Sequence, residues 1–204
     1  MVRKLVIGAW LAALALVLFE SYRIGPWKGQ PKDSFWQNYQ GPGSLFQVDL
    51  PDQPAFSIVD LSTYAAEFTA QRPRTAHWMS ARGANRYDYF LAGYFEWSEF
   101  SFRSADGEAT ARAGFRVALK ELEQRMGHKG IRVLGETDVE VGQEVAREYA
   151  IEAAGPGLIY PRKLKGRVRV LPRGLFLFFT IAVTPTNKGY DRAVQHYFDS
   201  FLLL

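Results

Sequence analysis

The chain has 204 residues, 48% hydrophobic and 15% aromatic, which is enough apolar material for a packed core and excludes extensive disorder. Its net charge is +4. The first 24 residues hold three of the cations and one acid, so the rest keeps +2 and lacks the basic excess typical of nucleic-acid binding. There is no cysteine, which excludes disulfides, thiol catalysis, thiolate metal sites and a lipid-modified cysteine.

The segment 1–24 predicts a membrane anchor. Residues 5–19 form an uncharged apolar run directly after Arg3 and Lys4, which is the shape of an export signal. No pair of small residues that would specify cleavage follows Phe19, so we expect an anchor that stays rather than a cleaved signal. A buried helix of the folded domain is the least favoured interpretation. The residues expected within the hydrocarbon are Leu5, Trp10, Leu14, Leu18 and Phe19.

This start also suggests a location. The lysine and arginine counts on the two sides of the run are nearly equal, and the compact basic start favours export. We therefore expect a single-pass membrane protein whose body lies outside the cytoplasm, in the periplasm. Residues 25–34 are rich in glycine, proline and charge and predict a linker, and residues 35–204 predict one folded domain.

Hydrophobic periodicity predicts the elements of that domain. Strands are expected at 45–50, where Pro51 and Pro54 close the strand, and then at 56–63, 77–81, 88–97, 131–141, 144–152, 164–171 and 175–184. Amphipathic helices are expected at 106–130 and 190–201. The first helix has Asp106 or Ser104 to cap its start and Gly127 to end it.

This order predicts the fold class. The stretch "LFLFFTIAV" is apolar on both faces and indicates a central strand that is covered on both sides. Strands in hairpin order with two amphipathic helices favour an α+β fold, in which the helices pack on an antiparallel β-sheet as an α/β sandwich. A hydrophobic helix would precede this domain at the N-terminus.

Two segments carry a family resemblance. "FWQNYQGPGSLFQVDLPDQPAF" resembles the opening of the PsbP-like α/β-sandwich superfamily, with Trp36, Tyr39, Phe46, Val48, Pro51 and Pro54 in the pattern W-x-x-Y…F-x-V-x-x-P-x-x-P. The closing "HYFDSFLLL" is similar to the last helix of bacterial members, where Phe198, Ser200 and Phe201 match loosely. The resemblance spans roughly residues 35–204. It implies an exported protein with a role in binding or assembly, and it transfers no functional residue to this chain.

The residues themselves predict no catalytic, cofactor or metal site. His77, His128 and His196 lack the spacing of metal ligands, and no serine occupies a strand-to-helix elbow. Aromatic residues crowd into 78–102, and most of them are expected in the core. If one face of the sheet were open, Phe90, Tyr94 and Trp97 would form a surface for a partner.

A row of cations is the strongest hint of a polyanion partner. Lys163, Lys165, Arg167 and Arg169 share one parity of a strand. The preceding strand has Glu148 and Glu152 on one parity, and a hairpin that aligns Glu148 with Arg167 also aligns Glu152 with Lys163. We therefore expect a solvated ladder of ion pairs on one face, rather than a nucleic-acid site.

Three functions stay open at this level. The first is a non-catalytic, membrane-tethered binding or scaffold domain with an unidentified protein partner and no nucleic acid. The second is a domain that binds a small apolar ligand between sheet and helix, which an enclosed apolar pocket would favour. The third is a hydrolase whose site is assembled from distant residues, which convergent carboxylates with shifted pKa values would favour.

Overall fold

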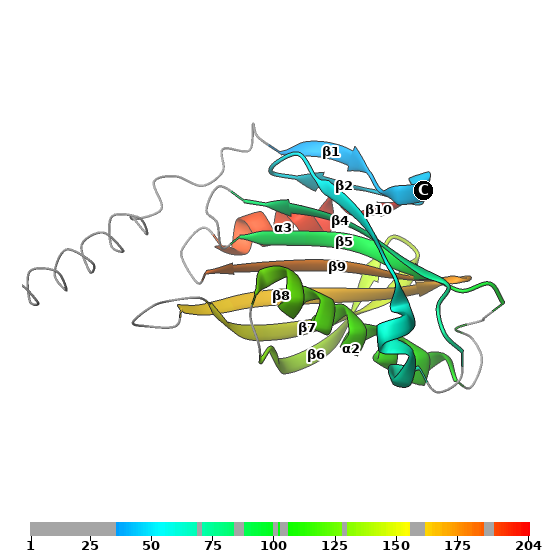
Figure 1. Cartoon of the computed structure of the whole chain (residues 1–204). Helices are drawn as coiled ribbons and strands as arrows, with labels where there is room; N and C mark the ends of the chain where they lie inside the picture. The colour runs from blue at the N-terminus through cyan, green and yellow to red at the C-terminus, as the bar shows by residue number, and fades with distance from the viewer. Residues whose placement is uncertain are drawn as a thin grey trace, which may run out of the picture.

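An antiparallel sheet of seven strands forms the middle layer of the fold (Figure 1). The computed structural model describes residues 36–68, 71–83, 88–99, 102, 106–127, 130–155, 162–185 and 190–204. In spatial order the strands are β3 (Ala55–Val59), β4 (Thr75–Arg82), β5 (Tyr89–Glu96), β9 (Phe176–Pro185), β8 (Arg162–Arg173), β7 (Glu144–Gly155) and β6 (Arg132–Val141). Strands β6 to β9 follow one another as hairpins, so this part of the sheet is built from neighbours in sequence.

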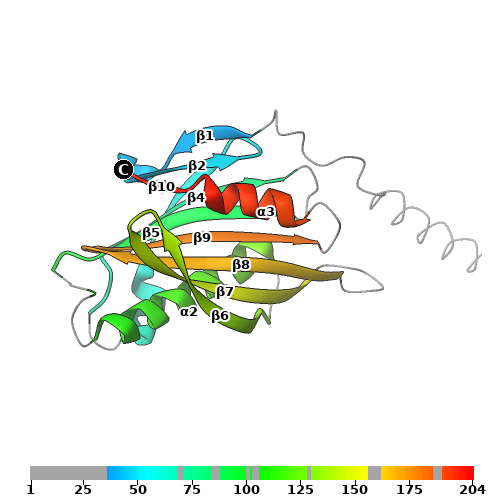
Figure 2. The same ribbon diagram turned by 180° about the vertical axis from the view of Figure 1, so that it is seen from behind.

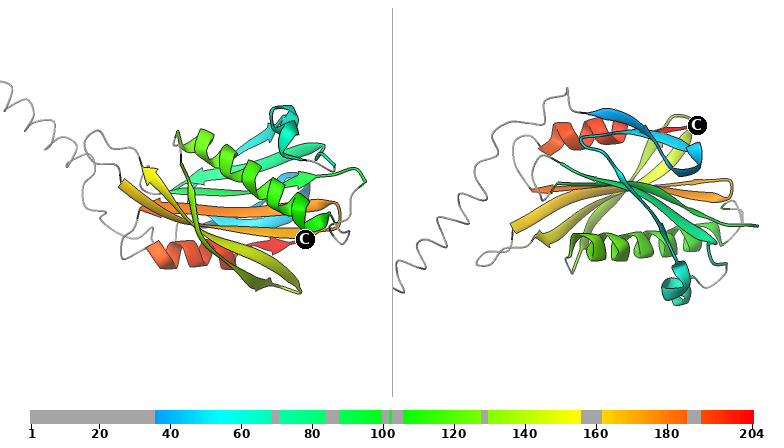
Figure 3. Two further views of the ribbon diagram at one scale, coloured as in Figure 1. Left: turned by 90° about the horizontal axis from the view of Figure 1, so that it is seen from below. Right: turned by 45° about the horizontal axis from the view of Figure 1, so that its top comes forward.

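Strand β9 requires cover on both faces of the sheet. Leu177, Phe179 and Ile181 belong to one hydrophobic core, whereas Phe178 and Ala182 belong to a second core on the opposite face. All five are buried. The fold therefore has three layers, with the sheet between two different covers (Figure 3).

Helix α2 (Gly107–Met126) covers the first face, together with the short helix η3 (Leu61–Glu67). A Cβ at Gly114 would lie 2.5 Å from Cδ2 of Leu177, so glycine lets the helix approach the sheet closely. Gly127, with a φ of 68°, ends α2 as the sequence predicts. Asp106 occupies the N-cap position, although its side chain makes no capping hydrogen bond.

Helix α3 (Tyr190–Asp199) and a second sheet cover the other face (Figure 2). The second sheet has the order β1 (Gln37–Gln40), β2 (Phe46–Leu50) and β10 (Leu202–Leu203), with the short helix η2 (Pro42–Ser44) between β1 and β2. The ring of Phe46 lies 5.3 Å from that of Phe201 and 6.3 Å from that of Phe178. Tyr197 is fully buried and donates a hydrogen bond of 2.6 Å to the carbonyl of Leu91. The start and the end of the described chain thus share one layer.

The predicted fold class is confirmed, while some of the elements differ. The strand expected at 56–63 ends at Val59, because the Asp60 carboxylate accepts a hydrogen bond from the amide of Ser62 and begins η3. Strands β1 and β10 were not predicted. The hydrophobic helix expected at the N-terminus and the boundaries of the anchor and linker lie outside the described residues and stay predictions.

The predicted charge ladder has the right face and the wrong register. Glu148 lies opposite Arg169, and Glu152 opposite Lys165, so the pairing of β7 with β8 is shifted by two residues from the expected one. A shift of two keeps every side chain on its expected face. Arg167 still reaches Glu148 diagonally, at 3.2 Å between Nη1 and Oε1. The side chain of Lys163, which was expected beside Glu152, is not among those that the structure describes.

The inner pair of the ladder is buried rather than solvated, whereas Lys165, opposite Glu152, is exposed as predicted. Glu148 and Arg169 are each 9% exposed, because the end of α3 covers them. Arg169 donates to Glu148 Oε2 at 3.0 Å through Nη2 and to the carbonyl of Phe198 at 3.2 Å through Nη1. Both Arg167 and Arg169 lie over the ring of Phe198, 4.8 and 4.7 Å from its centroid. The cations therefore hold the C-terminal end of α3 against the sheet.

We predict that removing one member of this pair destabilises the fold strongly. Arg169→Met leaves the Glu148 carboxylate buried with only the partly exposed Arg167, and we expect a loss of about 3–5 kcal/mol in the free energy of unfolding, measured with urea. The double variant Arg169→Met with Glu148→Leu removes both buried charges and should recover much of this loss. A single variant as stable as the natural protein would show that the pair does not hold α3.

Candidate functional site

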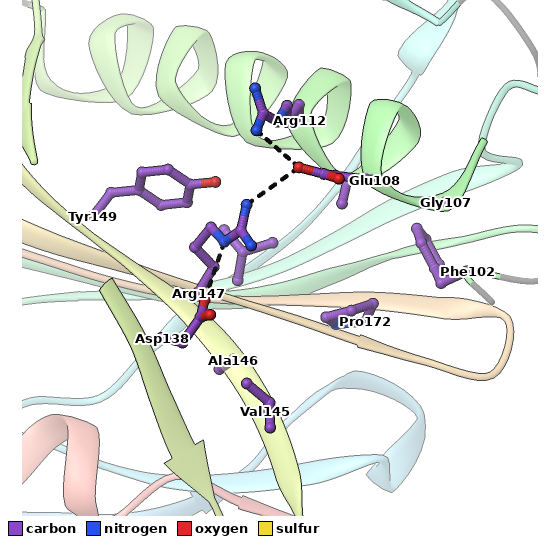
Figure 4. Close-up of a pocket in the computed structure, with 12 residues that line it drawn as sticks. Phe102, Gly107, Glu108, Arg112, Asp138, Val145, Ala146, Arg147, Tyr149 and Pro172 are labelled. Carbon is purple, nitrogen blue, oxygen red and sulfur yellow. Dashed lines mark hydrogen bonds and ion pairs between the residues drawn. The ribbon is translucent and has the colours of Figure 1, made fainter. Parts of the chain in front are cut away.

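A pocket opens between the first turns of α2 and the β6–β7 hairpin (Figure 4). It holds about 300 Å³. Its apolar lining includes Phe102, Ala111, Val145, Val170 and Pro172. Its charged lining consists of Glu108 and Arg112 from α2, Asp138 from β6 and Arg147 from β7. The pocket is therefore amphipathic, and it draws on four separate segments of the chain.

The twist of the β6–β7 hairpin makes the pocket. Near the middle of β7, Tyr149 stacks on Phe115 of α2, with ring centroids 3.9 Å apart, so helix and strand are in contact there. Toward its tip the hairpin curls to the opposite face (Figure 2), where Val139 and Val141 pack against the core under α3. The tip of the hairpin therefore bends away from the first turn of α2. The space between them is the pocket, in which Val145 is 62% exposed.

A chain of ion pairs crosses the pocket. Arg147 extends from the sheet toward α2 and contacts both Asp138, at 3.2 Å from Nε to Oδ1, and Glu108, at 3.4 Å from Nη1 to Oε1. Glu108 also accepts from Arg112, at 2.8 Å between Nη2 and Oε1. Each acid of the pocket therefore has an arginine partner, and Arg147 has two acidic partners.

These contacts determine the charge state of the pocket. Hydrogen bonding to Arg112, and then to Arg147, lowers the pKa of Glu108 from its ordinary value. Hydrogen bonding to Asp138 raises the pKa of Arg147. Because a general acid at neutral pH needs a raised carboxyl pKa, Glu108 is poorly suited to donate a proton. The charged wall is suited to hold polar groups of a bound partner in place.

The predicted partner surface is wrong. Phe90 is 1% exposed, Tyr94 4% and Trp97 1%, so these residues belong to the cores. The prediction required an open face of the sheet, and α3 with the β1–β2–β10 sheet covers the face of Phe90 and Tyr94. Trp97 packs in the other core and donates from Nε1 to the carbonyl of Gln71 at 3.1 Å.

The anchor residues Leu5, Trp10, Leu14, Leu18 and Phe19 lie outside the described residues. Among the helices that are described, none is both long and apolar enough to cross a membrane. The anchor therefore stays a prediction of the sequence.

The described histidines have local partners. His77 stacks on Tyr94 at 4.8 Å, and the Nε2 atom of His196 lies 3.0 Å from Oδ2 of Asp49. His128 is outside the described residues. Within the described ranges, no three acidic or histidine side chains are grouped so that they could hold a metal ion.

The sequence analysis did not predict the pocket, although the ion pair of Asp138 with Arg147 could have been predicted. The turn at residues 142–143 pairs Val141 with Glu144, and counting outward from that turn places Asp138 opposite Arg147. This cross-strand ion pair follows from the predicted hairpin alone. The contact of Glu108 with Arg147 joins residues 39 positions apart, and no local pattern predicts it.

Solved structures share this fold at low sequence identity. The solution structure of cyanobacterial PsbP (CyanoP) from Synechocystis sp. PCC 6803 matches with a TM-score of 0.50 and 12% identity, over 88% of this chain and 97% of that one. The Ran-binding protein Mog1p of Saccharomyces cerevisiae matches with a TM-score of 0.43 and 11% identity, over 82% and 95%. No protein-family model and no curated protein matches the chain. The first of these structures confirms the PsbP-like fold that the sequence motifs predict.

We predict that the contribution of Glu108 to stability depends on pH. Its pKa is lowered in the folded protein, so its contribution is present above the ordinary glutamate pKa of about 4.3 and is lost as the pH falls through the folded value. Glu108→Gln should therefore be less stable than the natural protein at pH 7, and the difference should shrink as the pH falls toward 3, in urea unfolding at each pH. The control is Glu99→Gln, at an exposed site that does not line the pocket. A difference that persists unchanged to pH 3 would contradict the ion pairs.

Proposed function

We propose that this chain is a non-catalytic binding domain and that the pocket between α2 and the β6–β7 hairpin is its binding site. One observation carries the proposal, namely the apolar lining that stays accessible beside a wall of paired charges. Exposed apolar surface rimmed by polar groups is typical of interaction sites. The PsbP-like resemblance of the sequence, which implies roles in binding and assembly, supports the same class of function.

The dimensions of the pocket favour a protein partner over a small apolar ligand. Pockets for small molecules hold roughly 300–1,000 Å³ and enclose most of the ligand. This pocket is at the lower limit, and four charged side chains line it. Such a site suits one large side chain of a partner, anchored on the apolar lining while the polar rim aligns the neighbouring groups.

We further propose that residues 5–19 tether this domain to a membrane, with the body on the extracytoplasmic side. The uncharged run after Arg3 and Lys4 supports the tether. In the described domain, Trp36 lies against Phe90 and His196, at ring distances of 5.3 and 4.8 Å. The preceding segment therefore joins the domain on the α3 face, whereas the pocket lies beside α2 on the other face. A tether attached there leaves the pocket accessible to a partner.

We predict that the pocket contacts the partner directly. The photoreactive residue benzoylphenylalanine is placed at Val145 in the full chain, in detergent-solubilised membranes, and should form a crosslink to one defined protein. The same residue at Ile58, which is 70% exposed on the opposite edge of the sheet, serves as the control and should not. Ala111→Trp, which fills the pocket, should abolish the crosslink while the circular dichroism spectrum stays unchanged.

Two results would contradict this function. The first is equal crosslinking from Val145 and Ile58, which would indicate non-specific contact. The second is robust hydrolysis of generic ester, phosphate or peptide substrates by the full chain that a single substitution abolishes, which would favour the hydrolase interpretation. A tightly bound apolar small molecule, released when Ala111→Trp fills the pocket, would favour the second function considered above.

We predict that the natural protein stays in the membrane fraction. An apolar helix resists extraction by high salt and alkaline buffer, whereas a protein bound only through charges is released. The full chain should stay in the pellet after both washes, and a chain that begins at Phe35 should be recovered in the supernatant. N-terminal sequencing of the mature protein gives an independent check, because a start downstream of Phe19 would show that the segment is a cleaved signal.

A further inference from the structure

The outer strand β6 offers a free edge next to the pocket. Strand β6 pairs with β7 on one side, and no described strand pairs with the other. Most β6 side chains are exposed, whereas those of the inner strands are largely buried. An edge with unpaired backbone N–H and C=O groups is a template for an added strand.

One face of this edge carries a row of acids. Glu136, Asp138 and Glu140 lie opposite Tyr149, Arg147 and Val145, so all three share the face that borders the pocket. Each of the three is exposed. Asp138 is paired with Arg147, but no described residue forms an ion pair with Glu136 or Glu140.

The charge of this surface is opposite to that of the whole chain. With Glu108, the row and the pocket wall present four carboxylates against two arginines, Arg112 and Arg147. The chain as a whole has a net charge of +4. The local excess of acid therefore does not follow from composition, and it favours a cationic partner at this site.

We propose that the partner contributes an extended, basic peptide segment that pairs with the free edge of β6. Alternate lysine or arginine side chains of that segment contact Glu136, Asp138 and Glu140, and an apolar side chain on the same face enters the pocket. The proposal rests on the proposed function and names the chemistry of its partner. Backbone hydrogen bonds supply affinity, and the acids select the partner.

The same acids argue against a second copy of this chain as the occupant. If two β6 strands paired edge to edge with these faces together, the acidic rows would lie side by side, and like charges across strands are destabilising. A register shift at Val133/Gly135 also interrupts the regular edge at one end of β6. The acidic row thus disfavours pairing between two copies of β6, whereas a basic strand is able to pair with the same edge.

The experiment measures binding of a labelled peptide, Lys-Thr-Lys-Thr-Lys-Thr-Phe amide, to the full chain in detergent by fluorescence anisotropy. Its lysines and phenylalanine share one face when it is extended. We expect saturable binding that weakens as the salt concentration is raised, and at least about tenfold weaker binding of the matched peptide with glutamate in place of lysine.

The double variant Glu136→Lys with Glu140→Lys should reverse this preference for the lysine peptide. The matched control, Asp52→Lys with Glu99→Lys, changes the net charge equally at exposed sites outside β6 and the pocket lining, and should keep the preference.

A pair of N-methylated peptides tests the edge pairing itself. Methyl groups on the amides of the odd residues block one edge of the peptide, and those on the even residues block the other. If the peptide adds to β6, one of the two should bind and the other should not. Equal binding of both, or binding that is unaffected by Glu136→Lys with Glu140→Lys, would overturn the proposal.

The outcomes separate this inference from the function on which it rests. If Val145 crosslinks to a partner but the lysine peptide does not bind, the pocket is a binding site and the basic segment is wrong. If the lysine peptide binds with the expected preference but no partner crosslinks at Val145, the proposed function fails and the peptide chemistry of the edge stands.

Discussion

Strand β9 sets the constraint on which the rest of the structure depends. Its side chains are apolar on both faces, so neither face of the central sheet is able to meet water along this strand. The chain supplies two different covers. Helix α2 is inserted between β5 and β6 and covers one face, whereas the other face is covered by segments from both ends of the described chain. This second cover depends on contacts between residues 36–50 and residues 190–204, which are far apart in sequence.

The buried charges attach that second cover to the sheet. Glu148 and Arg169 form an ion pair between neighbouring strands, and both residues are buried under α3. Its hydrogen bond to the carbonyl of Phe198 joins the sheet to the last turn of the helix. On the same face, His196 contacts Asp49 of β2, and the amide of Asp49 donates to Ser200 Oγ. Polar contacts with both the seven-stranded and the three-stranded sheet thus fix the position of helix α3.

The β6–β7 hairpin contributes side chains to both faces of the central sheet, and this arrangement creates the candidate site. Its tip contributes Val139 and Val141 to the core under α3, while its other face presents Asp138 and Arg147 to α2. Among the described elements, a hairpin twisted in this way opens the pocket at the start of α2 and leaves the outer edge of β6 without a strand partner. The pocket, the acidic row and the free edge are therefore consequences of one twisted hairpin, on the face opposite to the attachment of the N-terminal segment.

The sequence by itself determined most of the local elements, although not β1 or β10, and the faces of the charged side chains along β7 and β8. Periodicity located α2, the hairpins and the central strand, and the parity of Glu148 with Arg167 and Arg169 was predictable because side chains alternate along a strand. The register was not, since a shift of two residues preserves every face, and the packing of Arg169 under Phe198 distinguishes the alternatives. The burial of Phe90 and Tyr94, and the contact of Glu108 with Arg147, were decided only by the tertiary structure. The physical reason is that periodicity is local, whereas covering a sheet face or lining a pocket requires segments that only the folded chain brings together.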